Sequence, residues 1–207
     1  MRRAVRSAAV RAKRDPSTIT LIAVTKTRSV DEIAPLIAAG QRDFGESRVQ
    51  EAAAKWSALR AANPGMRLHM IGRLQSSKAN DAVAAFDTIH SLDRLSLFDA
   101  LADAGTRAGR FPGCFVQVNV GAEEQKGGVA VAELGPFLSR VRASPLPLAG
   151  LMCIPPQGLE AAPFFAFLNE LARRHDVTGL SMGMSGDFET AVMLGTTHLR
   201  VGSALFD

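Results

Sequence analysis

The sequence of 207 residues contains no tyrosine, a single tryptophan and only two cysteines. Modules that bind single-stranded nucleic acid stack bases on exposed aromatic rings, and here the phenylalanines fall mainly in core-like patterns, so a nucleic-acid-binding module is disfavoured. Cys114 and Cys153 lie in apolar, strand-like runs without a second ligand at metal-binding spacing. We therefore expect two buried, reduced thiols rather than a disulfide or a metal site.

Long hydrophobic runs are also absent from the chain. No run reaches the roughly 18 apolar residues of a membrane-spanning helix, and segment 1–14 lacks the apolar core of a secretory signal. The composition, 47% hydrophobic and 21% charged, is typical of a globular protein with one large core. We predict a single domain over residues 1–207 that is cytoplasmic and does not bind membranes.

Positive charge is unevenly distributed along the sequence. The formal net charge is +4, but residues 1–14 hold six basic and no acidic side chains, and the remaining residues hold 18 basic against 20 acidic ones. The basic segment is compatible with an organelle-targeting peptide or with an arm that follows phosphates. A first helix with one charged, solvated face is preferred, because Val5, Ala9 and Ala12 form a weak apolar stripe.

Short apolar or β-branched runs alternate with helical patterns along the whole chain. The predicted strands are 18–26, 42–47, 67–73, 87–92, 114–120, 148–154, 179–184 and 198–203. Strands that alternate with helices in this number predict an α/β fold, namely a single-domain TIM (β/α)8 barrel. An open, doubly wound sheet is the alternative, but the first strand–helix turn lacks G-x-G-x-x-G.

Two capping patterns mark where helices should begin. Ser29 with Glu32, and Ser47 with Gln50, have the spacing of a capping box, which predicts that both serines are N-caps. Gly40 is expected to end the first of these helices, since glycine commonly follows a helix C-terminus. Each predicted helix then has room for one buried face against the barrel.

The barrel prediction gives one lysine a particular position. Residues at the carboxyl ends of barrel strands face the active-site mouth, and phosphate commonly binds at the loops after strands 7 and 8. Lys26 is at the predicted end of the first strand, and glycines and serines cluster in segments 181–187 and 200–207. This pattern suggests a phosphorylated ligand beside a lysine that can act as a Schiff-base nucleophile. Spacing alone leaves an alternative open, a salt bridge from Lys26 to Asp43 or Glu46.

Several motifs occur in an order that resembles one known family. They are "AVTKT", "DFGESRVQEAAAKW", "LHMIGRLQSSK", "IHSLD", "VQVNVGAEEQKGGV", "GLMCIPP", "LSMGMSGDFETAV" and "HLRVGSALF". Over about residues 19–206, the chain resembles the pyridoxal 5′-phosphate homeostasis protein family. The resemblance implies a barrel like the N-terminal domain of alanine racemase, with pyridoxal 5′-phosphate (PLP) held as an imine on Lys26. It also implies a role in carrying or buffering PLP without established catalysis.

The resemblance further implies roles for individual residues. Arg200 is expected to face the pyridine nitrogen of PLP, where a guanidinium that stays protonated weakens the ring as an electron sink. The phosphate is expected to bind Ser185, Gly202 and Ser203, and Met182 is expected to line the pocket. PLP-dependent apoenzymes are the candidate recipients of the cofactor.

The chain departs from the family pattern in two loops. The family commonly has asparagine and then tyrosine where this chain has Ser47 and Arg48, so Ser47 would contact the cofactor through a shorter hydroxyl instead of an amide. In the next loop, Arg73 replaces the histidine of the family pattern "GHLQSNK". The chain also stops at Asp207, soon after the last predicted strand, so a short closing helix is expected.

The main enzymatic alternative is a PLP-dependent amino-acid racemase. Racemisation needs a second acid–base group on the opposite face of the imine, which alanine racemase takes from a tyrosine of another domain. The sequence contains no tyrosine and no second domain is predicted, which disfavours an efficient racemase. Cys114, Cys153 or a histidine such as His69 or His90 stays open as an alternative acid–base group. An aldolase that uses Lys26 is a further alternative, which a yellow colour of the purified protein would exclude.

Two features remain without a definite role. Segment 123–128, "EEQKGG", is predicted to be a flexible solvent loop, with an anion-binding nest, a lid or a partner contact as alternatives. No long apolar patch is left unassigned, so a monomer is expected.

Overall fold

The structure, a computed structural model, describes residues 1–123 and 125–206 and forms a closed, parallel eight-stranded barrel. The strands follow one another around the barrel in sequence order, and β8 pairs with β1. Their bounds are β1 Thr20–Val24, β2 Asp43–Glu46, β3 Arg67–Met70, β4 Thr88–Leu92, β5 Gly113–Gln117, β6 Leu148–Met152, β7 Leu180–Ser181 and β8 His198–Val201. The predicted barrel is confirmed, with strands shorter than expected.

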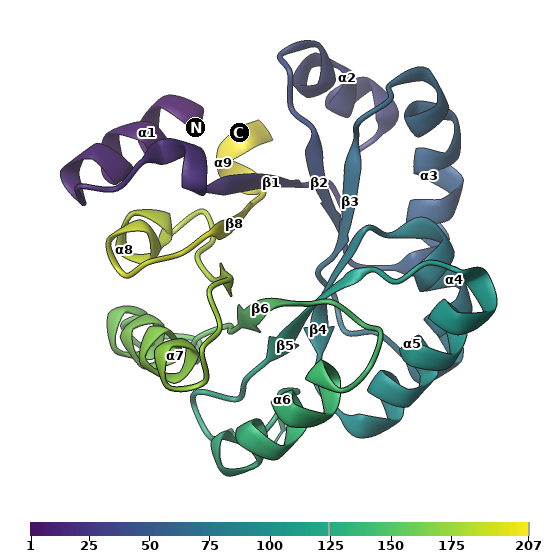
Figure 1. Ribbon diagram of the computed structural model, residues 1–207. Helices are drawn as coiled ribbons and strands as arrows, with labels where there is room; N and C mark the ends of the chain where they lie inside the picture. The colour runs from purple at the N-terminus through teal and green to yellow at the C-terminus, as the bar shows by residue number, and fades with distance from the viewer. Residues whose placement is uncertain (124, 207) are drawn as a thin grey trace.

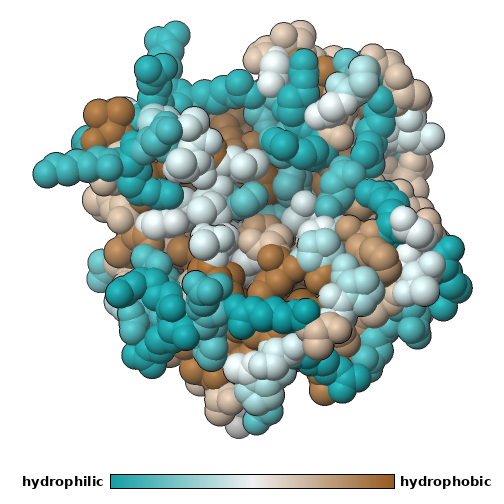
Figure 2. All heavy atoms as spheres, in the orientation of Figure 1, coloured by the Kyte–Doolittle hydropathy of each residue, from teal (hydrophilic) through white to brown (hydrophobic). Residues whose placement is uncertain are grey.

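Helices form an outer ring around these strands (Figure 1). Their bounds are α1 Arg2–Arg11, α2 Val30–Ala38, α3 Val49–Ala62, α4 Ala79–Ala85, α5 Leu95–Ala108, α6 Leu134–Arg142, α7 Ala162–Arg174, α8 Phe188–Met193 and α9 Ser203–Phe206. Short 3-10 turns span Pro16–Thr18, Ser76–Lys78 and Val131–Glu133. Hydrophilic residues dominate the rim of the face in Figure 2, and hydrophobic atoms show between them nearer its centre.

Apolar side chains fill two separate layers. The larger cluster joins strands to helices and includes the fully buried Phe44 and the nearly fully buried Trp56, whose ring centroids are 4.7 Å apart. Ile22, Phe115 and Met152 are also buried but lie outside that cluster. They belong to the inside of the barrel, where side chains of parallel strands meet.

The basic N-terminal segment forms α1, which packs against α8. Its buried side consists of Val5, Ala8 and Ala9. Arg14 donates to the carbonyls of Val192 and Thr196 at 2.8 and 2.7 Å, and Arg11 pairs with Glu189 at 2.8 Å. The expected first helix is confirmed, and part of its charge fixes it to the neighbouring helix.

One of the two predicted capping boxes is present. The amide of Glu32 donates to Ser29 Oγ at 3.3 Å, and the Glu32 carboxylate accepts from the Ser29 amide at 2.8 Å. The box predicted at Ser47 is wrong, because the N-cap of α3 is Arg48 and has no side-chain cap bond. A Cβ added to Gly72 would lie 2.4 Å from the Ser47 carbonyl oxygen, so the following loop lies directly on this backbone. That contact favours one more extended residue before the helix begins.

Both cysteines are buried free thiols, as predicted. Among residues 1–123 and 125–206, no helix is long and apolar enough to cross a membrane. The same part of the chain contains no group of three or more His, Cys, Asp or Glu side chains that could hold a metal ion.

Candidate functional site

Three loops meet at the carboxyl ends of β1, β7 and β8. The Arg28 guanidinium lies 4.6 Å from the centroid of the Phe206 ring, which joins the turn after β1 to α9. Ser185 Oγ, in the loop after β7, accepts from the Ala204 amide at 3.5 Å. The predicted lysine segment and the predicted phosphate-binding segments are therefore neighbours, as the barrel topology requires.

Lys26 lies in a turn at this mouth rather than at the end of a strand. β1 ends at Val24, and the side chain of Lys26 is exposed. In the described part of the chain, no hydrogen bond or ion pair engages its ammonium group. The alternative of a salt bridge to Asp43 or Glu46 is wrong, because both carboxylates bind other cations. The Lys26 amine is thus free to meet a ligand.

The turn that carries this lysine is fixed from α3. Lys55 Nζ donates to the carbonyls of Thr25 and Arg28 at 2.7 and 3.1 Å, and lies 2.9 Å from Glu46 Oε1. The Glu46 carboxylate is fully buried and also accepts from Thr25 Oγ1 and from Trp56 Nε1. Both ends of the turn are therefore anchored, while the lysine between them projects to solvent. Nothing in the sequence spacing indicated this contact.

Arg200, the second predicted site residue, is buried in β8. Its Nη1 donates to Ser181 Oγ at 2.6 Å, and its Nη2 donates to the Cys153 carbonyl at 3.0 Å. Burial lowers the pKa of Arg200 from its ordinary value, yet a guanidinium stays protonated at neutral pH. These bonds engage two of about five N–H groups, so the guanidinium is held in one orientation with donors to spare.

A chain of hydrogen bonds continues from Arg200 through the barrel. His90 Nδ1 lies 2.8 Å from Ser181 Oγ, and His90 Nε2 lies 3.0 Å from His69 Nδ1. His69 Nε2 in turn lies 3.1 Å from Asp43 Oδ1. Burial lowers the pKa of His90 well below its ordinary value, with the charges of His69, Arg200 and His198 adding to the effect. The inside of the barrel is therefore crossed by polar groups that are paired with one another.

The direction of this chain follows from counting donors. Burial alone would raise the pKa of Asp43, but hydrogen bonds from His69 and Arg67 outweigh it and lower the pKa to about 2, so Asp43 is an acceptor only. Asp43 therefore accepts from His69 Nε2–H, and in the arrangement that places one proton on each ring His90 Nε2–H donates to His69 Nδ1. His90 Nδ1 accepts the Ser181 hydroxyl proton, which leaves Ser181 Oγ to accept from the guanidinium. Every donor faces one acceptor.

The predicted phosphate-binding residues line the same mouth. Ser185 and Gly202 are half-buried, and Ser203 is exposed. A Cβ added to Gly202 would meet Val24 at 3.6 Å, an ordinary contact distance, so the glycine leaves open space beside the end of β1. Together these residues offer hydroxyl and amide donors next to Lys26.

Two other predicted site residues are placed differently. Met182 is fully buried in the cluster between barrel and helices, so the structure does not bring its side chain to the surface of the mouth. Ser47 is half-buried and lines a separate hollow between the loops after β2, β3 and β4. In the loop predicted at 123–128, Lys126 pairs with Glu123 at 2.8 Å, and Glu124 lies outside the described residues.

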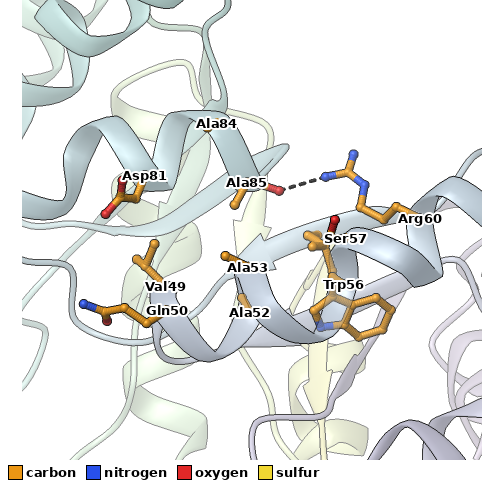
Figure 3. A pocket seen from close by; sticks show the side chains of 11 residues that line it. Val49, Gln50, Ala52, Ala53, Trp56, Ser57, Arg60, Asp81, Ala84 and Ala85 are labelled. Carbon is orange, nitrogen blue, oxygen red and sulfur yellow. Dashed lines mark hydrogen bonds between the residues drawn. The ribbon is translucent and has the colours of Figure 1, made fainter.

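The outer surface carries a groove that is not part of this site. Figure 3 shows it between α3 and α4, with the Ala53 and Ala84 side chains lining it and a hydrogen bond of 2.8 Å from Arg60 to the Ala85 carbonyl. Its volume is about 480 Å³. The groove offers few polar groups and lies on the helical shell, away from Lys26 and Arg200.

Comparison with known proteins defines the class. The profile of the family "Alanine racemase, N-terminal domain" matches residues 3–207. An alanine racemase of Clostridium difficile 630 superposes with a TM-score of 0.70 at 12% identity, covering 99% of this chain and 56% of that one. At that identity the likeness concerns the fold alone. The chain belongs to the alanine racemase N-terminal domain family, and within it to the pyridoxal phosphate homeostasis proteins, for the following reasons.

Its similar relatives carry that name. The pyridoxal phosphate homeostasis protein of Escherichia coli K12 is 37% identical, with 98% of this chain and 91% of the relative covered. That of Pseudomonas aeruginosa PAO1 is 40% identical, with coverage of 98% and 90%. The structure of PipY from Synechococcus elongatus PCC7942 with PLP bound has a TM-score of 0.84, at 39% identity and 98% coverage of each chain. The family resemblance seen in the motifs is thus confirmed.

Proposed function

We propose that this protein binds PLP at the mouth formed by the turn after β1 and the loops after β7 and β8. Its proposed role is in intracellular PLP homeostasis, as a carrier or buffer of the cofactor. One observation carries the proposal: an exposed lysine whose ammonium group has no partner among the described residues lies at the same end of the barrel as a buried, doubly hydrogen-bonded arginine. The names of the relatives and the PLP in the PipY structure support it.

The residues present fit this cofactor. Bound PLP supplies an aldehyde, and we propose that Lys26 Nζ condenses with it, releasing water and holding the cofactor as a Schiff base. Arg200 would donate a spare N–H to the unprotonated pyridine nitrogen. Ser185, Gly202 and Ser203 would bind the phosphate through hydroxyl and backbone donors.

A carrier without turnover is favoured over a racemase. Burial raises the pKa of Cys153, close to Arg200, to about 12, and that of Cys114 likewise to about 12, so neither thiol is a base at neutral pH. His69 and His90 are both engaged in the buried chain described above. We infer that racemisation is not the function. A cytoplasmic location, a monomeric state, a single domain and delivery to PLP-dependent apoenzymes stay predictions.

Chemical trapping tests the proposal directly. Protein incubated with PLP is treated with borohydride, digested and mapped by mass spectrometry. A reduced pyridoxyl phosphate group on the peptide that contains Lys26 is expected in the wild type and not in Lys26→Arg. Labelling spread over several surface lysines, with no preference for Lys26, would contradict the assignment.

A further inference from the structure

A second hollow opens at the carboxyl ends of β2, β3 and β4, beside the proposed cofactor site. Its volume is about 580 Å³. It is lined by Ser47, Arg48, Val49, Gln50, Met70, Arg73, Leu74, Gln75, Ser76, Lys78 and Arg94. None of these residues takes part in the PLP site proposed above, although the family resemblance implied a cofactor contact from Ser47.

The hollow is strongly positive. Its charged lining residues are all cations, namely Arg48, Arg73, Lys78 and Arg94. Arg94 pairs with Asp93, and Arg48 pairs with Glu51 at 2.7 Å. The side chains of Arg73 and Lys78 have no hydrogen-bond or ion-pair partner among residues 1–123 and 125–206. Two positive charges are therefore left without compensation.

Three of these cations occupy positions that are unfavourable for the helices. Arg48, Lys78 and Arg94 are the N-caps of α3, α4 and α5, and none of the three helices has a side-chain cap bond. N-caps favour Ser, Thr, Asp or Asn, and a cation opposes the positive end of the helix dipole. Since α1, α6, α7 and α8 also lack a side-chain cap bond, what distinguishes these three helix starts is the positive charge that they place around one hollow. Local rules broken together mark a functional site.

One of the cations is already positioned for binding. Arg94 donates to the Leu74 carbonyl at 2.9 Å and to Ser76 Oγ at 3.3 Å, besides its pairing with Asp93. These bonds fix a guanidinium at the side of the hollow, so that less side-chain entropy is lost when a ligand binds. The hydroxyl of Ser76 is a further polar group at the same place.

We infer that this hollow binds a small phosphate monoester as a dianion. Such a group carries a charge of about −1.5 to −2 at neutral pH, which matches the two uncompensated cations, and arginine matches its oxygens in a bidentate manner. A single carboxylate would leave one cation unpaired. The inference does not rest on the proposed function, because neither Lys26 nor Arg200 takes part. The phosphate group belongs either to PLP in transit or to an unrelated phosphate ester.

Titration with inorganic phosphate, followed by amide NMR shifts, tests the inference. The protein is first loaded with PLP so that the proposed cofactor site is occupied, and ionic strength is held constant with sodium chloride. Shifts are expected at Arg73, Ser76, Lys78 and Arg94. The double variant Arg73→Gln with Lys78→Gln should weaken binding by about tenfold or more, since it removes two charged contacts.

The matched control removes the same charge elsewhere. Arg3→Gln with Arg6→Gln neutralises two exposed cations of α1 and should leave the phosphate affinity unchanged. Shifts that are absent, that appear outside the hollow only, or that persist in the first double variant would overturn the inference. Pyridoxamine 5′-phosphate, which has no aldehyde, distinguishes PLP in transit from an unrelated phosphate ester. If it binds at these residues more tightly than inorganic phosphate, the hollow recognises the vitamer. If the two bind equally, the hollow recognises the phosphate group alone. If the cofactor does not load, the same titration of the unloaded protein still tests the hollow.

Discussion

At the scale of single residues, the inside of this barrel is organised by buried histidines. His90 is fully buried, and both of its ring nitrogens have partners, Ser181 and His69. A buried polar group is costly unless it is paired, and the chain from Arg200 to Asp43 pairs each member in turn. Its consequence is that the arginine proposed to face the cofactor is held by a network that ends at the opposite end of the barrel.

The first prediction concerns which ring nitrogens of His69 and His90 carry a proton. Side-chain nitrogen NMR should show a proton on Nε2 of His69, facing Asp43, and a proton on Nε2 of His90, facing His69. Ser181→Ala removes the acceptor of Arg200 and the donor to His90, which should lower the free energy of unfolding by about 1–3 kcal/mol. A proton on Nδ1 of either histidine, or a variant as stable as the wild type, would contradict the deduced direction.

The stability of the protein should depend on pH through His198. Burial lowers its pKa to about 4, with the charge of His69 as the next cause. Between pH 6.5 and 4 the unfolded chain therefore binds a proton that the folded protein does not, and stability falls as the pH falls. His198 alone should account for about 2 kcal/mol of the loss in the free energy of unfolding from pH 7 to pH 5, so the loss should be smaller by about that amount in His198→Leu. Urea unfolding at pH 7 and pH 5 measures the free energy of unfolding of both proteins. An equal loss in the wild type and in His198→Leu would refute the prediction.

At the scale of elements, α3 controls the turn that presents Lys26. Lys55 is mostly buried and bridges the buried Glu46 and two carbonyls of the turn after β1. A helix of the shell thus fixes backbone at the mouth through Lys55, which is not one of the proposed PLP-binding residues. The Lys26 side chain is exposed, and only the main chain of the turn is constrained.

Lys55→Met should test this anchoring. It leaves the Glu46 carboxylate buried without its cation, for which we expect a loss of about 3 kcal/mol in the free energy of unfolding. Amides in segment 25–28 should also exchange hydrogen faster. Adding Glu46→Gln should recover part of the stability but not the protection of the turn, because the two carbonyl contacts stay lost. Unchanged exchange in the single variant would show that the turn is fixed by other contacts.

The loop after β7 depends on a glycine. Gly183 has a φ of +96°, and an added Cβ would lie 2.5 Å from Ala191 Cβ and 2.7 Å from Leu199 Cδ2. Gly40 has a similar φ of +82° with nothing within 4 Å. Gly183→Ala should therefore destabilise the protein by about 2 kcal/mol more than Gly40→Ala, since only the first adds overpacking to backbone strain. Chemical denaturation of both variants measures the difference, and equal losses would argue against the crowding.

The same glycine shows where sequence-based prediction reaches its limit. The apolar run 179–184 predicts a strand, but β7 spans only Leu180–Ser181, because Gly183 adopts a left-handed backbone soon after. Hydrophobic periodicity gave the order of strands and helices, since each strand and each of the helices α1 to α8 has buried residues. It could not indicate where pairing stops, nor contacts such as Lys55 with Glu46 or His69 with His90, which depend on how separate elements pack. The barrel prediction placed Lys26 at the mouth, whereas the role of Arg200 was implied by motif resemblance.

At the scale of the whole molecule, one barrel supports two chemically different places at the same end. At the ends of β1, β7 and β8 lie Lys26, whose ammonium group has no partner in the described part of the chain, the hydrogen-bonded Arg200, and Gly202. The side of β2, β3 and β4 gathers cations at helix starts. Because the barrel is closed, both are mounted on the same rigid sheet, and a ligand at one place is near the other.

The most direct test of the central claim is the visible absorbance spectrum of the purified protein with PLP, recorded for the wild type and for Lys26→Ala. The account predicts an imine band near ~420 nm, set by the electronics of the cofactor, in the wild type only. A matched variant at another exposed lysine, Lys13→Ala, should keep the band. A wild type without the band at saturating PLP, or a Lys26→Ala variant that retains it in full, would contradict the assignment of Lys26 as the residue that holds PLP.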